Sequence, residues 1–170
     1  RVCTIVPFFV VLFVFFVGCQ TDSAPPSPIG ERLEAPTTSG SGQPRLYVEN
    51  GTVWMSWVDP GSAEQHALRY ATFDGSSWAK PATVATGDDW FVNWADLPSV
   101  RPLPGGRIAA HYLASSGASA LAYEVRITQA TTGGSWHEAV TPHTDGTPTE
   151  HGFVSMAPWG ENRLLAVWLD

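Results

Sequence analysis

Two stretches of the chain concentrate side chains that can do chemistry. Residues 88–98 and 141–152 bring together acidic, histidine, asparagine and tryptophan residues, namely Asp88, Asp89, Trp90, Asn93, Trp94, Asp96, His143, Asp145, Glu150 and His151. Asp96 and Glu150 are the best pair of carboxyl groups. One protonated and one ionised carboxyl group can act as general acid and as nucleophile or base in the hydrolysis of a glycosidic bond. His151, beside Glu150, can hold a proton or a metal ion, so these three residues are the catalytic candidates.

The other polar and aromatic residues of these stretches are candidates for binding a substrate. Trp90 and Trp94 can each stack on the face of a sugar ring, and packing between sheets is the equal alternative for both. Asn93 and Asp145 are the polar residues expected to contact a substrate beside them.

Other kinds of chemistry find no support in the sequence. The five histidines show neither helical i, i+4 pairing nor cysteine partners, so no zinc site and no other metal or cofactor is predicted. A phosphate-binding loop, a dinucleotide fingerprint and a Gly-x-Ser-x-Gly elbow are all missing from the sequence. The formal net charge of -7 has the wrong sign for gripping a phosphate backbone, which argues against a nucleic-acid partner.

The elements that must position these residues repeat along the chain. Residues 51–57, 106–112 and 162–168 align with one another, and Trp57, Tyr112 and Trp168 take equivalent places in them. A polar loop and two further strands follow each full copy, at residues 67–73 and 77–85, then at 121–128 and 135–140. Sixteen Gly and fourteen Pro among many Trp, Val and Thr also favour short strands and tight turns, so the predicted class is all-β.

Four short strands per repeat, with a glycine turn and a Trp at a fixed place, are typical of a β-propeller blade. We predict blades at residues 45–90 and 91–146 and a truncated blade at residues 147–170, with the missing blades beyond Asp170. A β-sandwich is the alternative, but it predicts no fixed repeat. The first strand of each blade would line the central channel, with Asp96 and Glu150 at its mouth. An unfinished ring would leave an apolar face and an open edge strand.

The turn at residues 73–78 resembles the Asp-box of sialidase-like propellers, Ser/Thr-x-Asp-x-Gly-x-Thr-Trp. Gly75, Ser77 and Trp78 match that pattern, whereas Asp74 stands one place later than the family's Asp. Residues 132–136 keep the Gly, hydroxyl and Trp elements. Over residues 45–170 the chain is similar to bacterial exo-sialidase-like lipoproteins with BNR repeats. The resemblance implies a six-bladed propeller of the sialidase type, in which the box closes a hairpin and its Trp packs between blades.

The resemblance also implies an arginine that clamps the substrate carboxylate, within the motif Phe/Tyr-Arg-Ile-Pro. Pro98, eight residues before Gly106, places Asp96 where that arginine would stand, and Ser41 and Gly152 take the place in the other two blades. Because Asp96 would repel the carboxylate of a sialic acid, a neutral glycan is the alternative substrate.

The first 44 residues are expected to direct and anchor the chain. Residues 5–17 form an apolar run shorter than the ~20 residues of a membrane span, which is typical of a secretory signal. Residues 16–19 resemble the bacterial lipobox, which implies a signal peptide at residues 1–18 and a lipid on Cys19. Gln20 then implies outer-membrane sorting within the cell envelope. Residues 19–44 would be the lipidated Cys and a flexible tether, with the lipid membrane as partner.

Two functions of different classes follow from these observations. The first is a surface-anchored, sialidase-like propeller that acts on glycans as an exo-sialidase or related glycoside hydrolase. The second is a non-catalytic propeller that binds a glycan or a protein through its loops.

Overall fold

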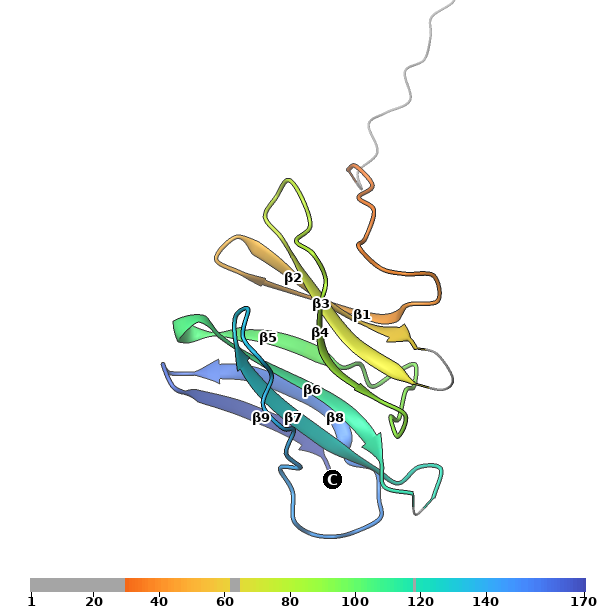
Figure 1. The fold of residues 1–170 in the computed structure, drawn as a ribbon. Helices are drawn as coiled ribbons and strands as arrows, with labels where there is room; N and C mark the ends of the chain where they lie inside the picture. The colour runs from red at the N-terminus through yellow and green to blue at the C-terminus, as the bar shows by residue number, and fades with distance from the viewer. Residues whose placement is uncertain (1–29, 62–64, 118) are drawn as a thin grey trace, which may run out of the picture. The chain divides into compact units, whose positions relative to one another are not determined.

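The computed structural model describes residues 30–61, 65–117 and 119–170, and these residues form antiparallel β-sheets (Figure 1). The chain divides into two units, Arg1–Leu33 and Glu34–Asp170, and all the strands belong to the second. The structure therefore confirms the predicted all-β class. Among the described residues there is no helix with the length and apolar character needed to span a membrane.

The first sheet, sheet A, is a meander of four strands in the order β1-β2-β3-β4. Its strands are β1 (Gly42–Glu49), β2 (Thr52–Pro60), β3 (His66–Phe73) and β4 (Ala82–Gly87). Asn50 and Gly51 join β1 to β2 with φ angles of 49° and 77°, the left-handed conformation that a tight Asn-Gly hairpin turn requires.

Two further sheets follow. Sheet B contains β5 (Ser99–Leu103), β6 (Arg107–Ser115) and β7 (Tyr123–Thr131), with a short 3₁₀ turn (Pro104–Gly106) between β5 and β6. Sheet C is the hairpin of β8 (Gly152–Trp159) and β9 (Arg163–Leu169). The second strands β2, β6 and β9 begin at residues 52, 107 and 163, which confirms the predicted register of the repeat.

The predicted last strands of the repeats differ from the structure. The strand expected at residues 77–85 is β4, which begins only at Ala82 because the turn at Asp74 continues to an isolated bridge between Phe73 and Trp78. The strand expected at residues 135–140 is reduced to one bridge between Ile127 and Val140. Most residues between Thr131 and Val140 are exposed, so little apolar surface is available there to fix a longer strand.

Residues 74–77 form a turn that the carboxylate of Asp74 closes. The Asp74 carboxylate accepts hydrogen bonds from the backbone N–H groups of Ser76 and Ser77, at 2.8 and 2.9 Å. These bonds hold the pKa of Asp74 at about 2, below its usual value. The two tryptophans that follow such turns pack against other sheet residues, Trp78 on Phe73 and Trp136 edge-on against Tyr70 of sheet A.

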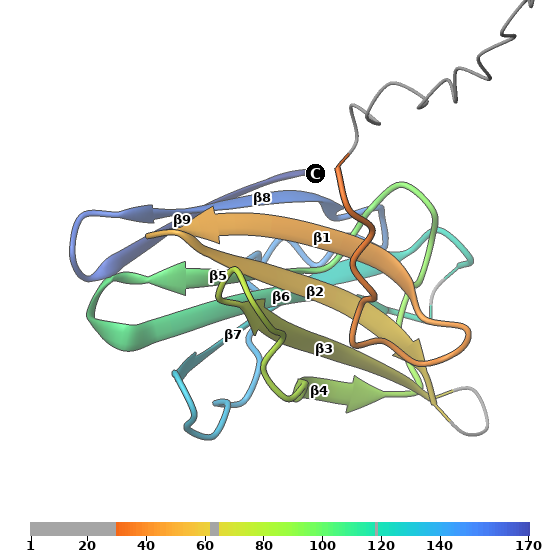
Figure 2. The same ribbon diagram turned by 90° about the horizontal axis from the view of Figure 1, so that it is seen from above.

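The three sheets pack face to face in chain order. Val58, Leu68, Tyr70 and Val84 of sheet A meet Ile108 of sheet B in one buried core. A second core joins sheets B and C through a set of side chains that includes Val125, Ile127, Val154 and Met156. The first strand of sheet B, β5, contacts both β1 and β8, and the arrows of these three strands point the same way in Figure 2.

The two outermost faces of this stack differ. On sheet C, large apolar side chains are exposed, namely Phe153, Trp159, Leu165, Val167 and Leu169. The structure thus contains the apolar face that was expected beyond the last repeat. On sheet A, Met55 and Trp57 are buried, and residues 35–44 line a small pocket with them, whereas Leu46 and Val48 of β1 are exposed. Strand β1 begins at Gly42, three residues before the boundary predicted at Arg45.

Candidate functional site

The end of the loop before β8 runs alongside the start of β7. Tyr123 donates its backbone N–H to Thr149, and its carbonyl oxygen accepts the N–H of His151, at 3.2 and 3.0 Å. This short parallel bridge places Glu150 beside the Tyr123 ring, with the Tyr123 hydroxyl 3.5 Å from Glu150 Oε2. Burial, followed by the negative charges of Glu150 and Asp96, raises the pKa of Tyr123 to about 12.

Asp96 reaches the same place from the loop before β5, but its side chain is buried. Its Oδ2 accepts the backbone N–H of Phe153 at 2.7 Å, so the carboxylate joins sheet B to the first residues of sheet C. Burial raises the pKa of Asp96, whereas the N–H groups of Phe153 and Val154 oppose that shift. The structure therefore brings Asp96 and Glu150 to one tyrosine, with only Glu150 exposed to solvent.

Glu150 faces a cavity of about 800 Å³. Its lining combines carboxylates, hydroxyl groups and apolar side chains, and includes Tyr123, Asp145, Glu150, Phe153, Leu169 and Asp170. We call it the Glu150 cavity. Apolar and aromatic surfaces with a few polar groups are typical of sites for small ligands, and 800 Å³ is within the usual range of their volumes.

Asp145, which lines this cavity, also belongs to a cluster with two histidines. His143 Nδ1 lies 3.0 Å from Asp145 Oδ1, and His151 Nε2 lies 3.4 Å from Asp145 Oδ2. The two imidazole rings are stacked, with their centroids 3.8 Å apart. Asp145 has a pKa well below its usual range, because Thr147 and then His143 donate hydrogen bonds to its carboxylate. We call His143, Asp145 and His151 the histidine cluster.

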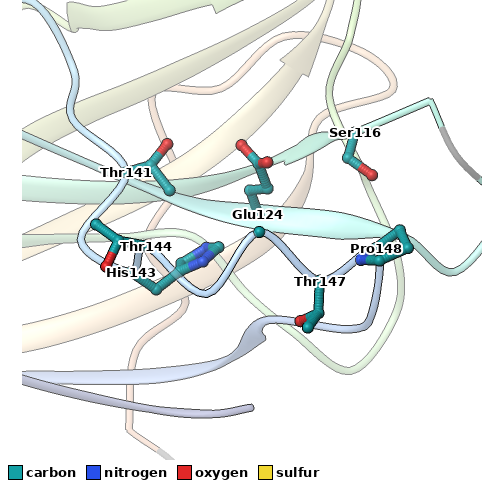
Figure 3. Close-up of a pocket in the computed structure, with 8 residues that line it drawn as sticks. Ser116, Glu124, Thr141, His143, Thr144, Thr147 and Pro148 are labelled. Atoms are coloured by element: carbon teal, nitrogen blue, oxygen red, sulfur yellow. The ribbon is translucent and has the colours of Figure 1, made fainter.

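A smaller pocket of about 290 Å³ lies on another side of the same loop. Figure 3 shows the His143 ring projecting from the loop into this pocket, with Glu124 above it on β7 and Thr147 beside it. His143 therefore belongs both to this pocket and to the histidine cluster.

The structure places the candidate residues of the stretch 88–98 in different surroundings. Trp90 is buried in the core between sheets A and B, where it stacks on Tyr112 at 4.5 Å. Of the two alternatives for Trp90, the structure therefore shows packing between the sheets and not an exposed surface for a sugar. The reason is local pairing, because Asp89 and Phe91 bond to the backbone at the end of β6 and so direct Trp90 inward. Trp94, in contrast, is 92% exposed.

Asn93 has a structural role in its loop. Its side-chain oxygen accepts the backbone N–H groups of Ala95 and Asp96, each at 2.8 Å, and its carbonyl accepts a hydrogen bond from Gln43. This turn fixes the path of the chain into Asp96. Neither Asn93 nor Trp94 lines the Glu150 cavity, whereas Asp145 and Glu150 do. Cys19, expected to carry a lipid, lies outside the described residues.

Sequence reasoning missed Tyr123 and the grouping of His143 with Asp145 and His151. Tyr123 stands at the start of a strand, where a tyrosine is an ordinary core residue, and only the long-range bridge to Glu150 makes it part of a site. The histidine cluster has the loop spacing His-x-Asp-x₅-His, which is neither helical nor a familiar metal motif.

Comparisons of the chain with protein-family models, with curated proteins and with solved structures returned no match. The function proposed below therefore rests on the Glu150 cavity and the histidine cluster.

Proposed function

We propose that the described sheets are blades of a sialidase-like β-propeller that binds a glycan in the Glu150 cavity. Two features support the propeller. The second strands of the three sheets recur with an almost constant spacing, and the first strands β1, β5 and β8 are neighbours, as strands lining a common axis would be.

The lining of the Glu150 cavity carries the glycan proposal. Carboxylates of Asp145, Glu150 and Asp170 offer acceptors for sugar hydroxyl groups, and the half-exposed Phe153 ring offers an apolar surface for a sugar face. None of the described residues that line the cavity is Lys or Arg. A neutral glycan therefore fits this lining better than a sialic acid, because no lysine or arginine is present among these described residues to pair with the carboxylate of a sialic acid.

The test is a binding assay of the full-length protein with neutral and sialylated oligosaccharides. Glu150→Gln is expected to weaken binding of a neutral ligand by about tenfold or more, because a charged hydrogen-bond acceptor is lost. Glu161→Gln, in the exposed turn between β8 and β9, is the matched control and should leave binding unchanged. Equal affinity of the Glu150→Gln protein and the wild type would contradict this site, and a preference for sialosides would contradict the charge argument.

Hydrolysis is a second candidate function, favoured by the placement of Asp96 and Glu150 at Tyr123. The raised pKa of Asp96 suits a general acid, and the exposed Glu150 suits a nucleophile or base. The buried position of Asp96 makes binding the first choice, since this carboxyl group does not line the Glu150 cavity. Turnover of neutral glycosides that falls in both Asp96→Asn and Glu150→Gln proteins would support hydrolysis. Binding of a glycan without turnover would contradict hydrolysis and support a function in binding.

We further propose that the protein is held on the bacterial cell envelope by a lipid on Cys19. The support is the sequence alone, an apolar run followed by Gly18-Cys19. Replacement of Cys19 by Ser should release the protein from the membrane fraction and abolish incorporation of labelled fatty acid. Unchanged labelling would contradict lipidation at Cys19.

A further inference from the structure

The hydrogen-bonding of His151 leaves one ring nitrogen without a compatible partner. Its Nδ1 lies 3.2 Å from the carbonyl oxygen of Tyr123, which can only accept, so Nδ1 carries the proton. In the neutral ring Nε2 is then an acceptor. That atom faces Asp145 Oδ2 at 3.4 Å and Asp170 Oδ1 at 3.3 Å, and both are acceptors as well. A positive charge between these three atoms would satisfy all of them.

We propose that the histidine cluster binds one divalent transition-metal ion, with Zn²⁺ the best match, and that Asp170 is the fourth ligand. Two imidazoles and two carboxylates are donors that Zn²⁺ commonly takes, whereas Mg²⁺ prefers oxygen ligands and water.

The distances around His151 support an ion better than a pair of hydrogen bonds. Charge-assisted hydrogen bonds between nitrogen and a carboxylate are about 2.7–2.9 Å long. The two distances from His151 Nε2, 3.4 and 3.3 Å, are longer. Bonds of about 2.0–2.1 Å to a tetrahedral Zn²⁺ would separate two ligand atoms by about 3.3–3.4 Å.

His143 adds a second, independent observation. Its side chain is only 8% exposed, and its Nε2 is buried without a hydrogen-bond partner. The candidate ligand atoms of His143, Asp145 and His151 all lie within 4.8 Å of one another. Because the two rings are stacked, His143 has to rotate out of the stack to direct a nitrogen at the same ion.

His151 also has the supporting contact that metal-binding histidines usually have. Donation of the Nδ1 proton to the Tyr123 carbonyl fixes the ring and leaves Nε2 free for the ion. Its complete burial holds the ring in that orientation. A bound ion would therefore connect β7, the loop before β8 and the end of β9.

The test is a titration of the full-length protein with Zn²⁺ alone, followed by competition with a chromophoric chelator, and with Co²⁺ as a spectroscopic probe. We expect one Zn²⁺ per chain, visible absorption typical of tetrahedral Co²⁺, and no binding of Mg²⁺ at the same concentration. Asp145→Asn and His143→Gln should each lower the affinity for Zn²⁺ by at least the about 10–100-fold that is lost when a supporting contact of a ligand is removed. Asp88→Asn and His137→Gln replace exposed residues outside the cluster and should change nothing.

Two results would overturn the proposal. One is a folded wild-type protein that binds no Zn²⁺. The other is Zn²⁺ affinity that stays the same in the Asp145→Asn and His143→Gln proteins. Asp145 is exposed, so its replacement should preserve the fold, and a thermal melt of each variant without metal verifies this.

Discussion

Gly152, the first residue of β8, allows the side chains of Asp96 and Tyr123 to approach the strand closely. A Cβ atom at this position would lie 2.1 Å from Asp96 Oδ2 and 2.8 Å from Tyr123 Cε2, and both of these side chains are buried. The next residue, Phe153, has a φ of 53°, which is uncommon for a residue with a side chain. The close contact between sheets B and C at the Glu150 cavity therefore depends on a position without a side chain.

Gly152→Ala is expected to lower the free energy of unfolding by about 1–3 kcal/mol, the usual cost of overpacking a core. The cost arises because neither Asp96 nor Tyr123 can move without breaking contacts between the sheets. Gly42→Ala is the matched control, since a Cβ there meets nothing within 4 Å and should change stability by less than about 0.5 kcal/mol. Chemical denaturation of both variants measures the difference, and equal midpoints would refute the steric argument.

At the scale of the element, the tight turn between β3 and β4 depends on one carboxylate. Asp74 accepts the N–H groups of Ser76 and Ser77, and Trp78 then packs on Phe73. The loop before β5 is organised differently, because its backbone pairs with β6 and places Trp90 inside while Trp94 remains outside. The first segment thus forms a turn, and the second contributes to the core between sheets A and B.

Asp74→Ala should lower the melting temperature, and the difference from wild type should depend on pH. The pKa of Asp74 is lowered to about 2 in the folded chain, so its stabilising effect is present above the ordinary value of 3.8. That effect is lost as the pH falls towards 2. Thermal melts of both proteins between neutral and acid pH test this, and Asp74→Asn, which keeps an acceptor oxygen, should lose less. A constant difference down to pH 2 would be inconsistent with the carboxylate's role.

Trp90 and Trp94 provide a second comparison within one loop. Trp90→Ala should cost about 3–5 kcal/mol of stability, because it leaves a large cavity beside Tyr112. Trp94→Ala should stay within about 0.5 kcal/mol, since that side chain is 92% exposed. Denaturant unfolding followed by circular dichroism measures both, and a mild Trp90→Ala variant would show that the sheets repack there.

How far the sequence predicts this molecule depends on the range of the contacts involved. The second strands and the turn at Asp74 could be predicted, because both arise from local patterns that recur along the chain. The burial of Trp90 could not, because it depends on pairing with β6 about 25 residues away. The histidine cluster was missed for a different reason, since its members are close in sequence but lie in a loop whose path follows no periodic pattern.

At the scale of the whole described unit, sheet C has an outer face of exposed apolar side chains that no described residue covers. It carries Phe153, Trp159, Leu165, Val167 and Leu169, each about half exposed or more. Strand β9 has β8 as its only strand partner among the described residues, so its outer edge also offers backbone hydrogen-bonding groups. Both features favour association with further β-structure.

The chain of residues 34–170, expressed by itself, should bind a hydrophobic dye and associate in solution. Replacement of Leu165 and Val167 by Thr should reduce dye binding and light scattering, because it makes the face polar while keeping residues suited to a strand. Thr52→Ser, at the start of a different sheet, serves as a control. A monomer that binds no dye would contradict the interpretation that this face needs a cover.

At the opposite end of the stack, the residues that precede β1 pack against sheet A. Residues 35–44 lie against Met55 and Trp57, and Ser41 hydrogen-bonds to Asp59, which also accepts the indole N–H of Trp57. Proteolytic removal of this segment would expose the apolar side chains of Met55 and Trp57 on that side of sheet A. In the intact chain, residues 35–44 therefore cover the part of sheet A around Met55 and Trp57.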